Sequence, residues 1–276
     1  MPTITLTTDF GEKDHYVGAV KGAIYSKSNA VRIVDISHTV SPFNCAEASY
    51  ILKNTYKHFT QGTVHIIGID SEYTVENTHL VVLLNGHYFV CANNGLLSLI
   101  ITEEKPEKII ELKHPMSAKS NFPVLEVFVD TACKLINGES IESLGVEIFE
   151  MKQSRGLIPV VNNEANQIIG TVIYIDNYGN VVSNIHRDLF EKIGQKRDYQ
   201  LSVRSVKIKK IHDKYSDFID FGIPKEDRNY DGEKLAIFNS SGYLELAIFR
   251  SNLQTVGGAS TLLGLNYWDT VTINFN

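Results

Sequence analysis

The sequence contains few residues of the kinds that cross-link small proteins or hold metal ions. Among its 276 residues there are three cysteines, and they lie far apart at Cys45, Cys91 and Cys133. Such an odd, scattered set gives neither a disulfide framework nor the paired spacing of a zinc site. The nine histidines form no HExxH motif. We therefore expect reduced thiols and no bound metal.

Positive charge and long apolar runs are also scarce. Lysine and arginine number 26 against 32 acidic residues, a formal net charge of -6, and there is no basic stripe suited to nucleic-acid phosphates. No apolar run approaches the roughly 18 residues of a membrane span, and the first residues lack a basic segment followed by an apolar one. We therefore expect a cytoplasmic protein with no nucleic-acid partner and no membrane insertion.

What is present is the composition of a globular protein with room for two domains. Hydrophobic residues make up 43% of the chain and charged residues 21%, which is typical of soluble proteins. The composition changes between residues 151 and 167, where polar stretches bracket a short apolar piece. We predict an α/β domain over residues 1–155, a linker over 156–167 and an all-β domain over 168–276.

The first domain is predicted to alternate strands and helices around a central, mostly parallel sheet. Residues 62–70 are nearly all apolar, as in a strand buried on both faces, and Asn85-Gly86 is a strong hairpin signal. Gly95 is expected to adopt a positive φ and Gly138 to end a helix. The predicted strands are residues 3–8, 31–37, 62–70, 80–84 and 87–91. Three helices are predicted: one that begins at residue 14, one over residues 44–56 and one over residues 124–137.

The second domain shows short alternating segments separated by turns, which is typical of a small barrel or sandwich. The predicted strands are residues 168–175, 181–185, 200–211, 234–239, 243–249 and 270–276.

Two predicted strands of the first domain end on an aspartate, Asp9 and Asp70. Ligands of open α/β sheets bind outside the carboxyl ends of the strands. If the two strands are neighbours, both carboxylates would therefore meet in one crevice, suited to a sugar diol or a cation. The alternative is that Asp9 only caps a turn and that Asp14 only caps or charges the start of the next helix.

Two polar turns of the second domain are further candidates. The turn at residues 175–180 offers the Asp176 carboxylate, the Tyr178 ring and the Asn180 amide, which suit an ammonium, a stacked base and the edge of that base. The turn at residues 239–243 offers hydroxyls and N–H groups that suit a carboxylate. Both are equally compatible with plain Asn/Gly turns.

Over nearly its whole length, the chain resembles the family that contains the S-adenosylmethionine hydroxide adenosyltransferases and the related fluorinase and chlorinase. The stretches that carry the resemblance are, in chain order, TTDFGEKDHYVGAVKG, IVDISHTVSPFN, GTVHIIGID, ANNGLL, IDNYGN with VSN, and NSSGYLELA. The resemblance implies an N-terminal α/β domain, a C-terminal β domain and a homotrimer. It also implies that S-adenosylmethionine or adenosine binds between neighbouring subunits, without a cofactor.

The same resemblance implies roles for single residues. Asp9 matches an aspartate that binds both ribose hydroxyls, and Phe43 takes the place of an aromatic residue beside the ribose. Asp176 matches the residue that receives the methionine ammonium. The other implied contacts are Tyr178 and Asn180 with adenine, Ser240 at the amino-acid end, and the aromatic residue Phe122.

The family's chemistry is displacement at the ribose C5′ carbon, with methionine leaving from a sulfonium. Because departure neutralises the positive charge, the protein needs no general acid, but only a dry pocket and an aligned nucleophile. In the hydrolytic branch an Asp, an Arg seven residues later and a His handle the water. Asp70 matches the first, whereas Asn77 and Pro123 stand at the other two positions.

Nearby side chains are candidates to replace the two missing groups: Glu72, Tyr73, His79 and Glu126. His79 is equally compatible with a surface residue at the start of a strand. The first hypothesis is therefore a hydrolase that forms adenosine and L-methionine, with Asp70 orienting the water. The second is a catalytically impaired homologue that binds S-adenosylmethionine or adenosine.

A halogenase of the same family is disfavoured. Its halide pocket needs small or hydroxyl-bearing groups beside Phe122, and Val124 stands where a serine or glycine would be. Ser241 stands where the halogenases carry arginine. The negative charge of Asp70 would also repel a halide in a pocket of low dielectric.

Overall fold

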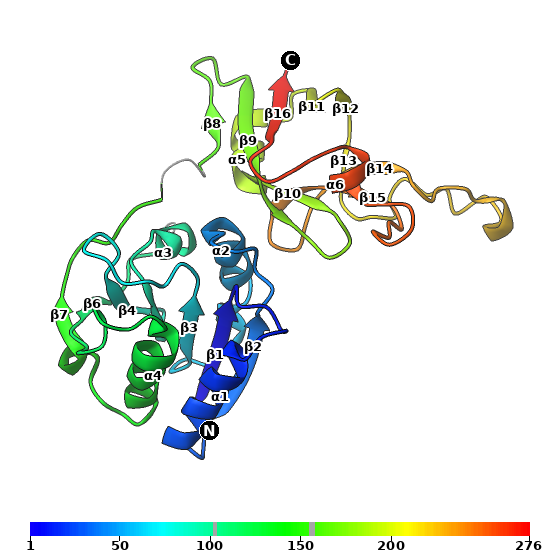
Figure 1. Cartoon of the computed structure of the whole chain (residues 1–276). Coiled ribbons are helices and arrows are strands. Elements are labelled where there is room, and N and C mark those ends of the chain that lie inside the picture. Colours follow the sequence, from blue (N-terminus) through cyan, green and yellow to red (C-terminus); the bar gives the residue numbers. More distant parts are fainter. Residues whose placement is uncertain (102–103, 155–157) are drawn as a thin grey trace. The chain divides into compact units, whose positions relative to one another are not determined.

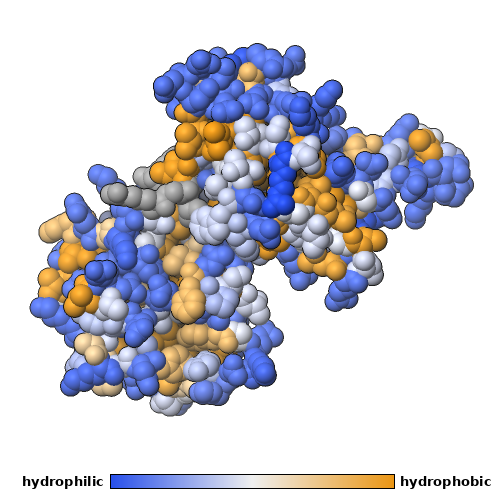
Figure 2. Space-filling view, turned by 45° about the horizontal axis from the view of Figure 1, so that its top comes forward, coloured by the Kyte–Doolittle hydropathy of each residue, from blue (hydrophilic) through white to orange (hydrophobic). Residues whose placement is uncertain are grey.

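The computed structural model describes residues 1–101, 104–154 and 158–276, and the chain divides into two compact units, Met1–Ser154 and Arg155–Asn276. Each unit has a sheet of its own (Figure 1). Each also has a hydrophobic core of its own. The expected two-domain organisation is confirmed. On the face shown in Figure 2, hydrophilic residues predominate with apolar ones interspersed. Within the described ranges, no helix is both long enough and apolar enough to span a membrane.

A seven-stranded sheet forms the centre of the first unit. Its strands are β1 (Thr3–Thr8), β2 (Arg32–Ser37), β3 (Val64–Gly68), β4 (His79–Leu84), β5 (His87–Ala92), β6 (Lys108–Leu112) and β7 (Gly145–Glu147), in the order β2-β1-β3-β5-β4-β6-β7. The pairings among β2, β1, β3 and β5 are parallel. The remaining three pairings are antiparallel, so the sheet is mixed rather than mostly parallel.

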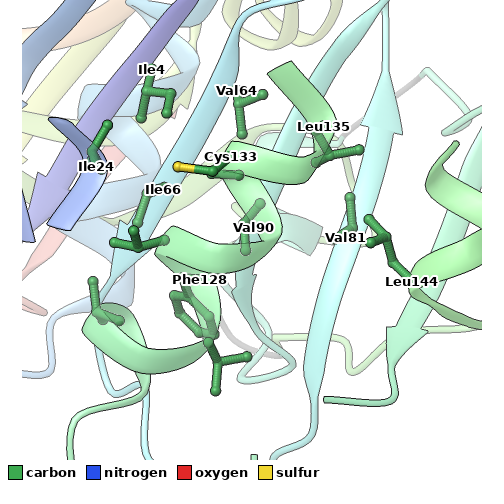
Figure 3. Packing of buried hydrophobic residues seen from close by; sticks show 14 of the residues in the cluster. Ile4, Ile24, Val64, Ile66, Val81, Val90, Phe128, Cys133, Leu135 and Leu144 are labelled. Atoms are coloured by element: carbon green, nitrogen blue, oxygen red, sulfur yellow. The ribbon is translucent and has the colours of Figure 1, made fainter. Parts of the chain in front are cut away.

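Helices pack on both faces of this sheet. They are α1 (Tyr16–Lys27), α2 (Cys45–Lys53), α3 (Leu96–Ile100), α4 (Val129–Ile136), the π-helical turn η2 (Val124–Phe128) and the 3₁₀ turns η1 (Tyr56–His58) and η3 (Ile141–Leu144). Strand side chains alternate between the two faces. Ile4 and Ile66 therefore pack with α1, η2 and α4 (Figure 3), whereas Ile67 and Phe89 pack with α2 and α3. The central strands are buried on both sides, as residues 62–70 predicted.

Most of the predicted turns and helix ends in this unit are confirmed. The Asn85-Gly86 hairpin has positive φ at both residues, 53° and 74°, and Gly95 has φ 93°. Gly138, with φ 88°, follows α4. The prediction for Asp14 was wrong: α1 starts only at Tyr16 with His15 at its N-cap, so the first helical turn holds no acidic residue.

The second unit is built on one nine-stranded sheet. Its strands are β8 (Val160–Val161), β9 (Gln167–Ile175), β10 (Val181–His186), β11 (Tyr199–Val203), β12 (Val206–Ile208), β13 (Ile211–His212), β14 (Lys234–Phe238), β15 (Tyr243–Ile248) and β16 (Thr270–Phe275). The order is β12-β11-β16-β9-β10-β15-β14-β13, with β8 beside β9. The short helices are α5 (Arg187–Gly194), the 3₁₀ turn η4 (Lys225–Asp227) and α6 (Ala259–Leu262).

Two boundaries in this unit differ from the prediction. The stretch predicted as one strand at residues 200–211 is a hairpin, because the chain reverses at Arg204, whose φ is 50°. Part of the predicted linker is also a strand, since β8 pairs with β9. Residues 156–157 of that linker lie outside the described residues.

Candidate functional site

Asp9 and Asp70 follow neighbouring parallel strands. β1 pairs with β3, and Thr8 lies opposite Gly68, so both aspartates leave the sheet at the same edge. Asp9 is half-buried, and burial raises the pKa of its carboxyl; a hydrogen bond from Phe43 opposes the rise and the negative charge of Asp70 adds to it. The two strands are therefore neighbours, which is the condition for both carboxylates to meet in one crevice. We call this the acidic edge, defined by Asp9 and Asp70.

The Cys45 thiol lies within the influence of the charges at this edge. Burial raises its pKa to about 11, and the negative charges of Asp70 and Asp9 contribute to the rise. The positive charge of Lys152 acts in the opposite direction. The Lys152 backbone N–H donates to Asn93 Oδ1 at 2.8 Å. Lys152 was not among the predicted site residues, because it lies about 80 residues from Asp70 along the chain.

Phe43 is presented to solvent by a fixed loop. Its backbone N–H donates to Asp9 Oδ2 at 2.9 Å, so Asp9 caps this loop rather than its own helix. Its φ is 62°, a left-handed conformation that is costly for an aromatic residue. The residue is nevertheless 72% exposed. An exposed ring held in a strained conformation beside a carboxylate is a natural contact for a flat ligand.

The loop between β3 and β4 carries Asp70 and is held by two asparagines. Asn77 Nδ2 donates to Asp70 O and to Glu72 O, both at 3.1 Å. Asn94 Nδ2 donates to Ile69 O at 2.9 Å. Asp70 itself has φ 44°. Asn77, which stands at the position of the family's arginine, therefore fixes the backbone that carries Asp70.

His79 is buried rather than at the surface. Its exposed fraction is 0%, and its Nε2–H donates to Ser71 O at 3.0 Å while Nδ1 lies 3.3 Å from Ser117 Oγ. Burial lowers its pKa, although the bond to Ser71 opposes the shift. Because both ring nitrogens already have partners inside the protein, His79 supports the β3–β4 loop and does not replace the missing water-handling group.

The other candidates for that task lie around the same loop and the start of η2. Glu72 and Glu126 are exposed, and Glu126 accepts a hydrogen bond from Ser120 Oγ. The Tyr73 ring packs edge-on against His79, with centroids 5.2 Å apart. None of these contacts joins them to Asp70.

Phe122 lies in an aromatic cluster next to the acidic edge. Its ring centroid is 5.5 Å from that of Phe10, the residue after Asp9, and 5.3 Å from that of Tyr16. Pro123 is the N-cap of η2, a position that tolerates the absence of an N–H. Val124 Cγ2 lies so close to Gly68 that a Cβ there would be only 2.9 Å away. Pro123 and Val124 thus start a helix and fill the space beside β3.

In the second unit, Asp176 organises its own turn. Its Oδ1 accepts from the backbone N–H groups of Tyr178 at 2.8 Å and Asn180 at 2.9 Å, and its Oδ2 accepts from Asn180 Nδ2 at 2.9 Å. Tyr178 is 64% exposed, whereas Asn180 is 5% exposed. Asn180 Oδ1 is buried and has no hydrogen-bond partner among the described residues. The turn therefore exposes one aromatic ring and holds one buried acceptor without a partner among the described residues.

The strand register places these groups on one face of the sheet. Asp176 and Asn180 close the β9–β10 hairpin, with the Asp176 N–H donating to Asn180 O. Val182, two residues after Asn180, lies opposite Glu245 of β15. Because side chains alternate along a strand, Asn180, Val182 and Glu245 share a face. The opposite face carries the core residues Val181 and Leu246.

Ser240 lies in the turn between β14 and β15, beside the His186 end of β10. It is exposed. The turn is fixed by Asn239, whose Oδ1 accepts from the N–H groups of Ser241 and Tyr243, each at 3.1 Å. Asn239 Nδ2 donates to Glu245 Oε2 at 3.2 Å. We call the surface defined by Asp176, Tyr178, Asn180, Ser240 and Glu245 the polar face.

The predicted residues thus form two groups. Asp9, Phe43 and Asp70 lie together in the first unit with Phe122 nearby. Asp176, Tyr178 and Asn180 lie together in one turn of the second unit, whereas Ser240 lies in the β14–β15 turn, beside the other end of β10. Over the described parts of the chain, no cluster of three or more His, Cys, Asp or Glu residues has the arrangement of a metal site.

Comparison with known proteins gives matches over nearly the whole chain. Residues 4–145 match the family model of the SAM hydroxide adenosyltransferase N-terminal domain, and residues 170–272 match that of the C-terminal domain. The chain is 27% identical to an (R)-S-adenosyl-L-methionine hydrolase of Methanocaldococcus jannaschii, covering 98% of this chain and 95% of that protein. It is 23% identical to a fluorinase of Actinopolyspora mzabensis, covering 89% and 90%.

A solved structure of a conserved protein from Thermotoga maritima is also similar. Its TM-score is 0.81 at 28% sequence identity, over 99% of this chain and 100% of that one. The similarity in sequence and in structure therefore extends across both units.

Proposed function

The chain belongs to the SAM hydroxide adenosyltransferase family, and on that premise we propose that it hydrolyses S-adenosyl-L-methionine to adenosine and L-methionine. The observation that carries the proposal is the acidic edge. Asp70, the residue that matches the family's water-handling aspartate, lies beside Asp9 at the ends of two adjacent parallel strands. Relatives bearing the hydrolase name match almost the full length of the chain.

The charge of the acidic edge suits this substrate. S-adenosylmethionine carries a sulfonium, and two carboxylates in a partly desolvated site attract a cation. One oxygen of Asp9 is engaged by the Phe43 N–H, which leaves the other for the ribose hydroxyls, with Phe43 beside the sugar. A carboxylate that accepts from a diol forms charge-assisted hydrogen bonds.

The reaction requires the chain to place a water molecule and little else. Attack on C5′ expels neutral methionine from the sulfonium, so no acid must protonate the leaving group. Asp70 accepts a hydrogen bond from the water, orients its lone pair toward C5′ and takes up the proton as the C–O bond forms. Asn77 Nδ2 donates to the Asp70 carbonyl and so helps to hold the Asp70 backbone in its left-handed conformation.

The polar face supplies the remaining contacts in this proposal. Asp176 receives the ammonium of the methionine part, Tyr178 stacks on adenine and Ser240 lies at the amino-acid end. The unpartnered Asn180 Oδ1 accepts from the exocyclic amine of the base. The protein works as a cytoplasmic homotrimer, with the nucleoside held between neighbouring subunits and no cofactor. A monomer in sedimentation velocity would contradict the trimer.

A halogenase fits the acidic edge poorly. A halide beside Asp70 and Asp9 would meet two like charges, and Val124 occupies the space beside Gly68. A binding protein without turnover is the second candidate, and it is favoured by one observation. The positions of the two missing water-handling groups are taken by Asn77, which clamps the loop, and by Pro123, which starts a helix.

The test is turnover by purified protein and by matched variants. Incubation with S-adenosylmethionine should release adenosine above a buffer control, as measured by liquid chromatography. Asp70→Asn should lower the rate about 100-fold, in the range found for lost general bases, whereas Glu72→Gln on the same loop should retain it. Binding of adenosine, seen as a raised melting temperature, without any turnover would instead establish the second candidate.

A further inference from the structure

His38 is a buried histidine beside the turn that carries Asp9. It is 6% exposed and directly follows β2, the strand that pairs with β1. Its Nδ1 lies 2.8 Å from Thr8 Oγ1, and its backbone O accepts from the Gly11 N–H at 2.7 Å. Thr8 and Gly11 are the two ends of the turn that contains Asp9 and Phe10. His38 therefore holds this turn at both ends.

The other ring nitrogen of His38 faces a carboxylate. Nε2 lies 3.1 Å from Asp35 Oδ1, and Lys21 Nζ of α1 lies 2.5 Å from Asp35 Oδ2. Burial alone would raise the pKa of Asp35, but hydrogen bonds from Lys21 and His38 outweigh it and lower that pKa. The ionised Asp35 can only accept. In its neutral form, His38 then carries its proton on Nε2, so that Nδ1 accepts the Thr8 hydroxyl proton.

Thr8 connects His38 to the turn. It is 1% exposed, so water does not compete for its hydroxyl. Because the hydroxyl proton goes to His38, the Thr8 oxygen is an acceptor within the turn, and the Phe10 N–H donates to it at 3.4 Å. Asp9 lies between these two residues and accepts from the Phe43 N–H through Oδ2. Its carboxylate is therefore oriented by the Phe43 loop and by the backbone that His38 holds.

We propose that His38 is a positioning residue that holds Asp9 where its free oxygen meets the two ribose hydroxyls. His38 contacts no substrate in this proposal and transfers no proton. A diol is demanding of the carboxylate position, because both hydroxyls must reach it at once. A small shift of the turn should therefore lower the affinity for the diol and spare the rest of the nucleoside. The inference rests on the proposed function, since the diol belongs to the ribose of the substrate.

The test compares two nucleosides that differ only in the diol. Isothermal titration of the full-length protein measures the affinity for adenosine and for 2′,3′-dideoxyadenosine, which lacks both hydroxyls. His38→Ala should weaken adenosine binding about tenfold and change binding of the dideoxy analogue less than about twofold. His38→Asn, whose Oδ1 can accept the Thr8 hydroxyl proton, should restore most of the affinity. Thr39→Ala, at the exposed neighbouring position, is the matched control and should change neither affinity.

A double-mutant cycle tests whether His38 acts through Asp9. In an Asp9→Asn protein the diol contact is already weakened, so His38→Ala should cause less than about a twofold further loss of adenosine affinity. A further loss as large as in the unmodified protein would show that His38 acts independently of Asp9, which overturns the inference.

A second variant keeps the test decisive if His38→Ala does not fold. Thr8→Val keeps a β-branched residue in β1, removes the hydroxyl that faces His38, and should weaken adenosine binding about threefold with the same selectivity. Equal losses for both nucleosides would show a merely structural role, and no loss for either would show no role; both results overturn the inference. If the unmodified protein binds neither nucleoside, the proposed function itself fails, and the inference fails with it.

Discussion

At the scale of single residues, Asp70 shows how local strain marks a site. It is a non-glycine residue with positive φ, and such conformations persist only where the surroundings hold them. Here the side chains of Asn77 and Asn94 bond the carbonyls of residues 69 and 70. The sequence predicted Asp70 as a strand-end carboxylate, because strand ends follow from local pattern. Its strain and its clamp depend on contacts from other segments and were not predictable.

The burial of His79, in contrast, was not predictable from the sequence around it. A histidine after a polar stretch at a strand start was compatible with a surface position. Its burial follows from Ser117 and from the Phe128 ring, whose centroid is 4.9 Å away. Ser117 and Phe128 lie 38 and 49 positions after His79 along the chain, so no local pattern predicts these contacts.

A second buried histidine, His65, makes the first unit sensitive to acid. Its Nδ1 lies 2.7 Å from Thr5 Oγ1, and burial, with a smaller effect of His87, lowers its pKa from 6.5 to about 3. Below pH 6.5 the unfolded chain binds a proton at His65 that the folded chain does not bind. The free energy of unfolding is therefore at its full value above pH 6.5 and decreases as the pH falls toward 3. Between pH 7 and pH 5 the loss should be about 2 kcal/mol.

Urea unfolding at a series of pH values measures this effect. His65→Gln should flatten the fall in unfolding free energy between pH 6.5 and 4.5, whereas His58→Gln at an exposed position should leave the slope unchanged. An unaltered slope in His65→Gln would contradict the assignment.

At the scale of elements, the hairpin signal determined more of the sheet than we expected from it. Asn85-Gly86 forces β4 to run antiparallel to β5, since a two-residue loop cannot make a parallel crossover. The parallel part of the sheet is therefore limited to the four strands β2, β1, β3 and β5. The predicted alternation of strands and helices did not indicate where the parallel part of the sheet ends.

The helix predicted over residues 124–137 is a π-helical turn that runs into an α-helix. Apolar periodicity does not distinguish five residues of π-helix from α-helix. The turn brings Val124 against Gly68 at the end of β3, close to the acidic edge.

The β3–β4 loop can be tested as an element. Asn77→Ala removes the bonds to Asp70 O and Glu72 O, and should lower the free energy of unfolding by about 1–2 kcal/mol. Because Asp70 loses its clamp, kcat should fall about tenfold with little change in KM. Steady-state kinetics and urea unfolding measure the two effects.

Glu76→Ala is the matched control, since its side chain is exposed on the same loop. It should change neither quantity. A stable Asn77→Ala protein with unchanged kcat would show that the clamp has no part in placing Asp70.

At the scale of the whole molecule, both the two-domain organisation and the family were predictable from sequence. Both were indicated by short motifs that each occur once and follow one another along the chain in the order typical of the family. Examples are the stretch around Asp9 and the stretch around Asp176. The strand order of both sheets was not predictable, because pairing joins residues far apart. Neither was the cluster of Glu245, Asn239 and Tyr215, which joins the β14–β15 hairpin to a residue 30 positions before Glu245.

If water displaces methionine at C5′, the oxygen of the adenosine 5′-hydroxyl comes from the solvent, and isotope labelling follows that oxygen. The protein is incubated with S-adenosylmethionine in ¹⁸O-enriched water, and the adenosine is analysed by mass spectrometry. We predict one ¹⁸O atom at the 5′ position of each adenosine, with methionine released in equal amount and unlabelled. Adenosine without the label, or no adenosine above the buffer control, would contradict the account.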